Sequence, residues 1–326
     1  MRVLVTGGAG YIGSHTARRL KASGFQPVIF DNLSVGHAFA LVGMDSIVAD
    51  LADRDALSAA LRRVDAVMHF AAFSGVSESV RDPRKYFHNN VQTGLSLLHA
   101  VLDAGIRYFI LSSTCAVYGP PSRVPIPIDT PRLPINPYGA TKLALEHALE
   151  AYSAAHGLQY ASLRYFNAAG ADESGAIGEL HRPETHLIPN ALLTASGQRS
   201  ELQIFGSDYP TPDGTCIRDY IHVNDLADAH ILALRYLHNG GESAAFNLGT
   251  GTGYSVLEVV QAVEAVTGRP LPRRVCPRRA GDPPALIADP SHANKLLQWK
   301  PSRNLRDMVS NAWQWMQSPT YLKAQT

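Results

Sequence analysis

The sequence predicts an α/β fold, in which helices cover both faces of a doubly wound parallel sheet and a smaller α/β lobe follows. Short apolar runs alternate with helical patterns up to about residue 170, as in a parallel sheet with helical crossovers. A glycine-rich turn links the first strand to the first helix. Beyond residue 170 the pattern breaks into shorter pieces, which predicts the second lobe.

The predicted elements of the first half follow in order. Strands are expected at Arg2–Val5, Val28–Phe30, Ser46–Val48, Ala66–Phe70, Tyr108–Leu111 and Tyr160–Arg164, with helices at Ile12–Ala22, Asp53–Arg62, Asn90–Ala104 and Tyr138–His156. Gly24, Gly105 and Gly157 each follow a helix, where a left-handed cap is common. Asn136 and Pro137 suit the cap and first turn of the last helix.

In the second half of the chain, the pattern predicts a loop followed by helices, short strands and further loops. The loop covers Ala171–Thr185. The helices expected after it begin at about Leu187 and cover Val223–Leu237, Ser255–Thr267 and Leu305–Met316. Strands are expected at Leu202–Phe205 and Phe246–Leu248, a loop at Ser207–Thr215 and an ordered loop at Arg269–Pro284. We therefore expect a nucleotide-binding domain over residues 1–170 with a return segment at about 217–250. Residues 171–216 and 251–326 form the predicted substrate cap.

Bulk composition indicates an ordinary globular enzyme. The chain has 326 residues, 45% of them hydrophobic and 17% charged, which argues against a disordered or fibrous protein. A net charge of +1 gives no electrostatic reason to expect nucleic acid or an anionic membrane as a partner.

The cysteines and the N-terminal residues predict a cytoplasmic location. Cys115, Cys216 and Cys276 are odd in number and widely spaced, without a CxxC pair, which suggests reduced thiols. The first apolar run, Val3–Val5, is far too short for a signal-peptide core or a membrane span.

The glycine-rich turn predicts a site for a dinucleotide. Gly7, Gly10 and Gly13 are spaced GxxGxxG between the first strand and the first helix, and Tyr11 and Ile12 lie within the turn. Glycines let backbone amides approach a pyrophosphate, and the N-terminus of a helix adds positive potential. The alternative is a tight strand–helix turn without a ligand.

An acidic residue at the end of the second strand favours NAD over NADP. Asp31 lies 18 residues after Gly13, where a carboxylate accepts the adenosine ribose hydroxyls and repels a 2′-phosphate. Its alternative role is to form a turn before Asn32. Asp50 and Leu51, after the third strand, are candidates to hold the adenine.

Tyr138 and Lys142 form the candidate catalytic pair. Their spacing of four places both side chains on one helix face. The reference pKa of a phenol is near 10, so it must fall by roughly three units for the phenol to act as a base at neutral pH. That shift corresponds to about 4 kcal/mol of stabilisation of the phenolate. One unit charge at about 4 Å supplies a contribution of that order when the effective dielectric constant is near 20. Tyr138 is thus a candidate proton acceptor for an alcohol undergoing oxidation.

The fifth predicted strand is followed at its C-terminal end by three residues with hydroxyl groups, Ser112, Ser113 and Thr114. Open α/β sheets bind ligands at this end of their strands. The three hydroxyl groups are candidates to orient an alcohol. Turn and cap chemistry is the alternative explanation for the same residues.

Motifs along nearly the whole chain resemble one family. They are Thr6–His15, Asp31–Leu33, His69–Ala72, Ser112–Gly119, Tyr138–Lys142, Arg164–Asn167, Ile217–Val223 and Arg278–Asp282. In this order they resemble the nucleotide-sugar 4-epimerases of the extended short-chain dehydrogenase/reductase family. The resemblance implies that Tyr138 is the base and that Lys142 lowers its pKa and binds the nicotinamide ribose. It also implies that Thr114, where relatives often have Ser, hydrogen-bonds the sugar O4.

The same resemblance implies further binding residues. Those expected to line NAD, besides the turn and Asp31, are Phe70, Ala71, Asn89, Ser112 and Tyr165. Those expected to bind a UDP-hexose are Asn167, His186, Leu187, Phe205, Arg218, Tyr220, Arg279 and Asp282. Ser74 stands where some relatives have lysine, and His186 where some have asparagine. Without the resemblance, Arg218 and Asp219 would be interpreted as a local ion pair.

The implied reaction inverts sugar C4, with UDP-galactose and UDP-glucose as the expected pair and NAD tightly bound. UDP-N-acetylhexosamines and UDP-pentoses stay open as substrates, because Leu286, in the segment that walls the hexose pocket in relatives, is intermediate in size. A 4,6-dehydratase would need an acid and a base after Thr114, where this chain has Cys115 and Ala116.

Other classes are less consistent with the residues. A decarboxylase would have to recognise a C6 carboxylate, and no residue is assigned to that task. A dinucleotide-sensing regulator has little need for Thr114, Tyr138 and Lys142. No metal is expected, since the 13 His show no ligand-type spacing, and His181 with His186 is interpreted as loop or substrate surface. The family implies a homodimer through the helices at Asn90–Ala104 and Tyr138–His156.

Overall fold

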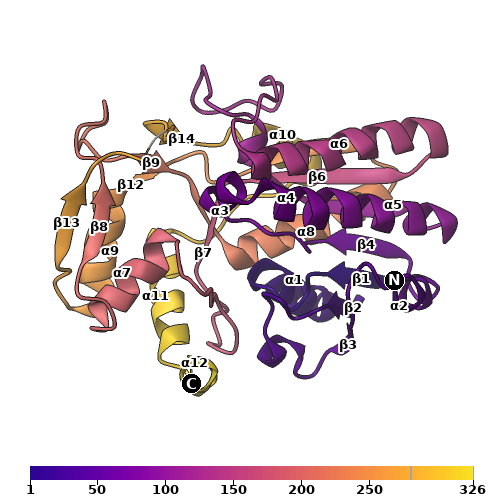
Figure 1. Cartoon of the computed structure of the whole chain (residues 1–326), viewed down its shortest axis with the longest axis horizontal. Coiled ribbons are helices and arrows are strands. Elements are labelled where there is room, and N and C mark those ends of the chain that lie inside the picture. Colours follow the sequence, from indigo (N-terminus) through magenta and orange to yellow (C-terminus); the bar gives the residue numbers. More distant parts are fainter. Residues whose placement is uncertain (280, 326) are drawn as a thin grey trace.

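Seven parallel strands form the central sheet of the computed structural model, which describes residues 1–279 and 281–325 (Figure 1). Ala280, part of one motif quoted above, lies outside the described residues. The strand order is β11-β6-β5-β4-β1-β2-β3, and every neighbouring pair is parallel. The order reverses between β1 and β4, the switch point at which such sheets bind ligands. The strands are β1 (Arg2–Thr6), β2 (Gln26–Asp31), β3 (Asp45–Val48), β4 (Ala66–His69), β5 (Tyr108–Thr114), β6 (Gln159–Tyr165) and β11 (Ala244–Leu248).

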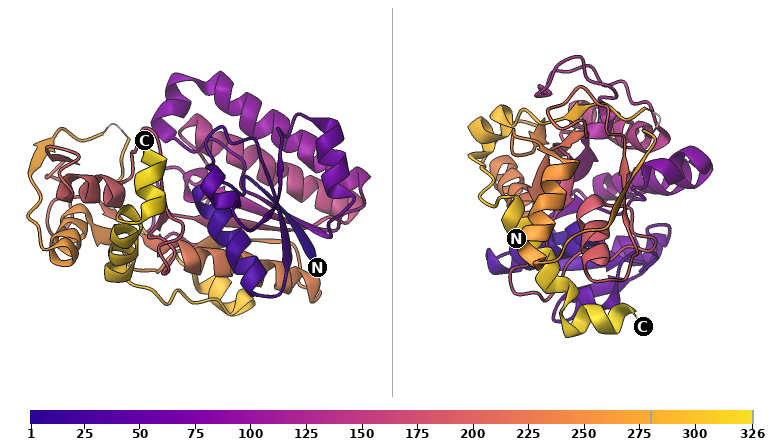
Figure 2. Two further views of the ribbon diagram at one scale, coloured as in Figure 1. Left: turned by 90° about the horizontal axis from the view of Figure 1, so that it is seen from below. Right: turned by 90° about the vertical axis from the view of Figure 1, so that its left-hand side faces the viewer.

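Helices cover both faces of the sheet (Figure 2). The apolar residues of β1 pack against both layers of helices: Val3 and Val5 lie in one core and Leu4 in another, and all three are fully buried. A strand that is covered on both faces needs such an unbroken apolar run. The first core includes residues of α1 (Tyr11–Ala22), α8 (Val223–His238) and α10 (Ser291–Leu297), and the second includes residues of α2 (Arg54–Leu61), α5 (Thr93–Asp103) and α6 (Pro137–His156).

These elements confirm the predicted Rossmann-type arrangement, with shifts at element ends. Asn136 caps α6 by accepting a hydrogen bond from the N–H of Gly139 at 2.9 Å, as expected. Gly24, Gly105 and Gly157 all have positive φ. The helix predicted from Asn90 begins differently: α3 (Val76–Arg81), α4 (Pro83–Tyr86) and a π-helical segment (Phe87–Gln92) precede α5.

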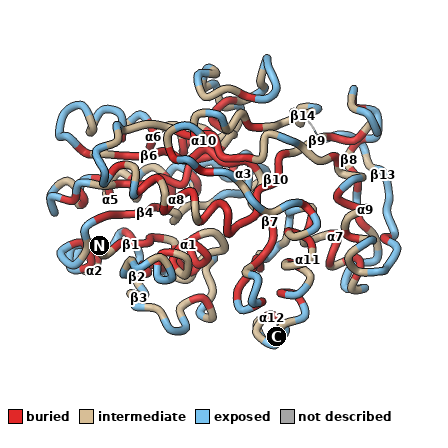
Figure 3. The backbone as a smooth tube through the Cα atoms, turned by 180° about the vertical axis from the view of Figure 1, so that it is seen from behind, coloured by how far each residue is buried: buried red, intermediate tan, exposed pale blue. Residues whose placement is uncertain are grey.

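A smaller lobe has its own apolar core beside the sheet (Figures 1 and 3). It contains α7 (Leu187–Ala195), β8 (Leu202–Phe205), α9 (Val256–Thr267), β13 (Arg273–Cys276), α11 (Leu305–Met316) and α12 (Pro319–Gln325). The loop predicted over Arg269–Pro284 is wrong at Arg273–Cys276, which forms a strand parallel to β8. Three of the four residues of β13 are exposed, so the strand lacks the buried apolar run by which strands are predicted.

Short strands join the two parts. They are β7 (Asn167–Ala169), β9 (Ile217–Arg218), β10 (Tyr220–His222), β12 (Tyr254–Ser255) and β14 (Ala285–Leu286), and short 3₁₀ turns lie at Ala38–Leu41 and Cys115–Val117. β10 pairs with β7, and β9 lies between β12 and β14. Between the cap segments, the chain returns to the sheet through α8 and β11. The three cysteines are free. Among the described residues, no helix combines the length and apolarity needed to cross a bilayer.

Candidate active site

The glycine turn after β1 is shaped by close backbone packing. Gly7 has φ of +73°, and a Cβ there would lie 2.5 Å from the backbone nitrogen of Ala71. A Cβ on Gly13 would lie 2.3 Å from the carbonyl oxygen of Gly7. Gly10 caps α1 without a side chain, and a Cβ there would meet only the Gly7 oxygen, at 3.2 Å. The first-turn N–H groups of α1 thus lack a side-chain acceptor, which suits an anion.

Asp31 ends β2 at the same edge of the sheet and is 8% exposed. Its carboxylate accepts hydrogen bonds from the N–H groups of Ala9 (2.9 Å) and Leu33 (2.8 Å). Burial raises the pKa of Asp31, while these two N–H groups oppose the shift. Asn32 donates to Asp50 at 2.6 Å, so the structure brings these two predicted residues together. Leu51 is buried in the adjacent core.

Tyr138 and Thr114 meet where β5 ends beside the start of α6. Thr114 is the last residue of β5, and its hydrogen bond favours the phenolate of Tyr138. Burial is the larger effect and raises the pKa of Tyr138 to about 12, with a small further increase from Cys115. The protein's side chains therefore do not alone make this phenol a base at neutral pH.

Lys142 is almost fully buried, and its ammonium donates to the carbonyl oxygen of Ser112 at 2.8 Å. Burial lowers the pKa of Lys142 to about 8, and the Glu146 carboxylate opposes this shift. The hydrogen bond to Ser112 fixes the ammonium at the end of β5, on the same helix face as Tyr138.

Glu146 is a supporting residue that sequence reasoning missed. It lies one turn after Lys142, is 1% exposed, and accepts from the Ser113 hydroxyl at 2.5 Å. Arg164 of β6 donates to both of its oxygens, the shorter distance being 2.6 Å. This network fixes α6 to β5 and β6. The signal was available, because Tyr138, Lys142 and Glu146 recur every four residues.

Except for Asn89, the residues expected to line NAD lie along the C-terminal edge of the sheet. Phe70 and Ala71 follow β4, and the backbone of Ala71 lies against Gly7. The Ser112 hydroxyl makes a short hydrogen bond with the Tyr165 hydroxyl. Asn89, in the π-helical segment, donates to Asn90 at 3.0 Å. Tyr11 donates to the carbonyl of Gly170 at 2.7 Å, which ties the glycine turn to the chain leaving the sheet.

Two arginines expected to bind the UDP-sugar contact other residues expected to bind it. The guanidinium of Arg279 lies over the Phe205 ring, 4.1 Å from its centroid. Arg218 pairs with Asp282 at 2.8 Å rather than with Asp219, so the interpretation of a local Arg218–Asp219 pair is wrong. Asp219 instead accepts backbone N–H bonds, including those of Thr250, Gly251 and Ala288. Arg218 also acts electrostatically on Cys115, next to Thr114.

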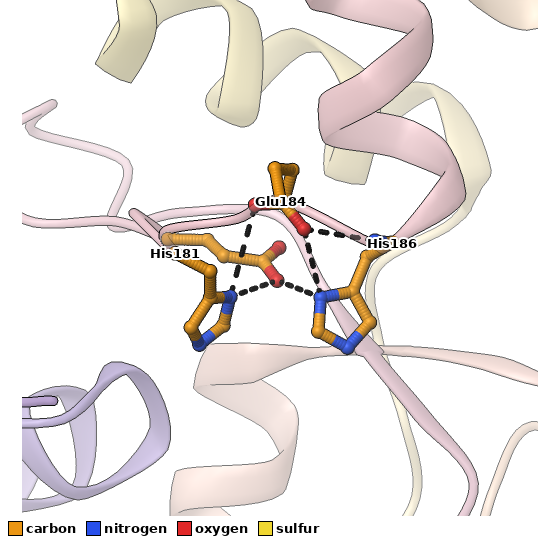
Figure 4. A group of neighbouring side chains, drawn as sticks. His181, Glu184 and His186 are labelled. Carbon is orange, nitrogen blue, oxygen red and sulfur yellow. Dashed lines mark hydrogen bonds and ion pairs between the residues drawn. The ribbon is translucent and has the colours of Figure 1, made fainter. Parts of the chain in front are cut away.

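The remaining predicted sugar-binding residues are less closely grouped. Asn167 donates to the carbonyl of Asp219 at 3.0 Å, whereas Tyr220 is buried in the core of the smaller lobe. His186 caps α7, and Leu187 is its first residue. The His186 ring lies against the Glu179 and Glu184 carboxylates, and His181 joins them (Figure 4). Sequence spacing did not predict this cluster.

These residues fit a dinucleotide. The turn has no side chain at Gly10, before a helix N-terminus, and a buried carboxylate lies one strand away. Asp31 and Thr114 end strands on opposite sides of β1, so the described edge suits an extended ligand with an adenosine end and a reactive end.

The fold and site define an enzyme class, and the chain belongs to the NAD dependent epimerase/dehydratase family, whose model matches residues 3–249. It is 50% identical over 318 residues to the UDP-glucose 4-epimerase of Halalkalibacterium halodurans, covering 97% of this chain and 95% of that protein. It is 49% identical over 319 residues to that of Lacticaseibacillus casei, covering 97% and 96%.

Solved structures are similar to this chain over nearly its whole length. The UDP-glucose 4-epimerase of Brucella ovis in complex with NAD has a TM-score of 0.94 and 49% identity, with 98% of both chains covered. The enzyme of Stenotrophomonas maltophila with bound NAD and formylated UDP-arabinopyranose has a TM-score of 0.96 and 41% identity, with 100% of both chains covered.

Proposed function

We propose that this chain is a UDP-glucose 4-epimerase, an isomerase that interconverts UDP-galactose and UDP-glucose with bound NAD. The observation that carries the proposal is the meeting of Thr114 and Tyr138 at the sheet edge, with the Lys142 ammonium bonded to the carbonyl of Ser112 in the same strand as Thr114. The near full-length similarity to UDP-glucose 4-epimerases supports the same activity.

In the proposed reaction, Tyr138 takes the proton of the C4 hydroxyl and later returns it, and Thr114 orients O4. Moving the pKa of Tyr138 from about 12 to near 7 requires about 7 kcal/mol. The Lys142 ammonium supplies about 4 kcal/mol if it lies about 4 Å away at an effective dielectric constant near 20. Bound NAD⁺ supplies a reversible hydride acceptor and a second positive charge.

Inversion requires that the chain hold the nucleotide firmly and the hexose loosely. We assign diphosphate binding to Arg218 and Arg279, ribose binding to Asp282, and stacking on uracil to Phe205. Asn167, His186, Leu187 and Tyr220 complete the proposed substrate side. The cofactor side comprises the glycine turn with Tyr11 and Ile12, Asp31, Asn32, Asp50, Leu51, Phe70, Ala71, Asn89, Ser112 and Tyr165, together with Tyr138 and Lys142.

The proposed division of labour follows the two parts of the chain. Residues 1–170 form the NAD-binding domain with a return segment at 217–250, and residues 171–216 and 251–326 form the UDP-sugar-binding cap, to which Asn167, Arg218 and Tyr220 add contacts from outside the cap ranges. We further propose a cytoplasmic homodimer joined through α5 and α6.

The test is incubation of the purified protein with UDP-galactose, UDP-N-acetylgalactosamine and UDP-xylose separately, with no added cofactor. We expect UDP-galactose to give UDP-glucose at the highest rate. No cofactor needs to be added, because NAD is regenerated in each turnover and stays bound. Preference for either other sugar would reassign the substrate. A requirement for NADPH, with a stoichiometrically reduced product, would overturn the epimerase proposal.

A further inference from the structure

Four potential metal ligands converge in the segment before α7. Glu179, His181, Glu184 and His186 each offer one atom, and these four atoms all lie within 4.8 Å of one another. Figure 4 shows the Nδ1 atoms of His181 and His186 turned toward the carboxylate groups, with each Nε2 facing away. The four residues form what we call the His/Glu cluster.

The spacing of these atoms suits a small tetrahedral ion. Nδ1 of His186 lies 2.7 Å from a Glu179 oxygen and 3.0 Å from a Glu184 oxygen. Nδ1 of His181 lies 3.0 Å and 3.7 Å from oxygens of the same two carboxylates. Zinc with bonds of about 2.0–2.2 Å holds its ligand atoms about 3.3–3.6 Å apart, so small side-chain shifts would complete the geometry.

The cluster concentrates its contacts on two ring nitrogens and two carboxylates. Each Nδ1 carries at most one hydrogen, yet each faces oxygens of both carboxylates, so four contacts share two hydrogens at most. The side chains of Glu179 and Glu184 are only 6% and 7% exposed. Two buried carboxylates require compensating positive charge, which two protonated imidazole rings supply in the ion pairs with His181 and His186. One divalent ion bound to the four ligands would supply the same two charges and displace the two ring protons.

The cluster is held in place and can be reached. A Glu184 oxygen accepts from the N–H groups of Thr185 and His186 at 2.7 and 2.8 Å, which fixes that carboxylate. The indole of Trp315 donates to the carbonyl of Glu179 at 2.9 Å. A cavity of about 240 Å³ is lined in part by Glu179, His181 and Glu184, and the His186 side chain is 51% exposed. A supported ligand set with an entry path is what a metal site needs.

We propose that Glu179, His181, Glu184 and His186 bind one divalent transition metal ion, of which zinc fits the mixture of imidazole and carboxylate ligands best. The ion fixes the segment before α7. This assignment departs from the expectation, drawn from spacing, that the chain has no metal ligands. It shares His186 with the proposed substrate side, but it does not depend on the proposed reaction.

The test measures metal content rather than turnover. The NAD-loaded protein is incubated with ZnCl₂, passed over a chelating resin, and its zinc is measured by mass spectrometry. We expect one zinc per chain in the wild type and in His88→Asn, a control that removes an exposed histidine outside the cluster. His181→Asn and Glu184→Gln should weaken binding by at least about 100-fold.

A second measurement guards against misfolded variants. Co²⁺ added to the wild type should give the intense visible spectrum of a tetrahedral site, and Zn²⁺ should abolish it. Equal zinc in the wild type and both cluster variants would mean nonspecific surface binding and would overturn the proposal. A wild type that retains no zinc and gives only the spectrum of hydrated cobalt would overturn it as well.

Discussion

At the scale of single residues, burial and neighbouring polar groups act in opposite directions on the pKa values of Tyr138 and Lys142. Burial raises the pKa of Tyr138 and lowers that of Lys142, so it disfavours the charged form of each side chain. The hydrogen bond from Lys142 to the Ser112 carbonyl and the nearby Glu146 carboxylate favour the ammonium. A buried lysine that keeps its charge is a strong local source of positive potential for a phenolate.

Replacing Lys142 with Met tests this view. Loss of about 4 kcal/mol of phenolate stabilisation predicts a fall in kcat of about 10³-fold and a shift of the kcat–pH profile toward higher pH. The measurement is kcat against pH for variant and wild type at equal NAD content. An unchanged profile would show that Lys142 does not tune Tyr138.

At the scale of elements, the start of α6 determines how Tyr138 meets Thr114. Gly139 allows this contact, because a Cβ there would lie 2.5 Å from the carbonyl oxygen of Ala116. Gly157, at the other end of α6, has φ of +72° and no heavy atom within 4 Å of its would-be Cβ. The two glycines serve packing and capping respectively.

This difference predicts unequal effects of two substitutions in one helix. Gly139→Ala should displace the first turn of α6 and lower kcat by about 100-fold, since a shift of about 1 Å in a reacting group has such an effect. Gly157→Ala should reduce the free energy of unfolding by about 1 kcal/mol and leave kcat unchanged. Both are checked by steady-state rates and urea denaturation. Equal rates for the two variants would exclude the role given to Gly139.

At the scale of the whole molecule, a few specific contacts connect the sheet to the smaller lobe. Tyr11 reaches Gly170, and His37 bonds to the carbonyl of Leu180 at 2.7 Å. Within the larger part, Arg19 of α1 donates to both oxygens of Asp228 in α8, with distances of 2.6 and 2.7 Å to the two oxygens. These contacts involve residues far apart in the sequence, so the glycine turn and the segment before α7 are positioned together.

The same scale explains what the sequence could and could not predict. Strands such as Arg2–Thr6 are buried on both faces, and their apolar runs predicted them closely. Arg273–Cys276 forms a strand because β8 lies beside it, which its exposed residues could not reveal. The His/Glu cluster depends on how an irregular loop folds, and no periodicity marks such a loop. The pairing of Arg218 with Asp282 likewise joins segments 64 residues apart.

The most direct test of the central claim is the turnover of UDP-galactose by NAD-loaded Tyr138→Phe. Loss of the phenol removes the only proton acceptor in the proposed reaction, so we expect kcat to fall by about 10²–10⁴-fold while NAD content and UDP binding are retained. Turnover equal to that of the wild type would contradict the account.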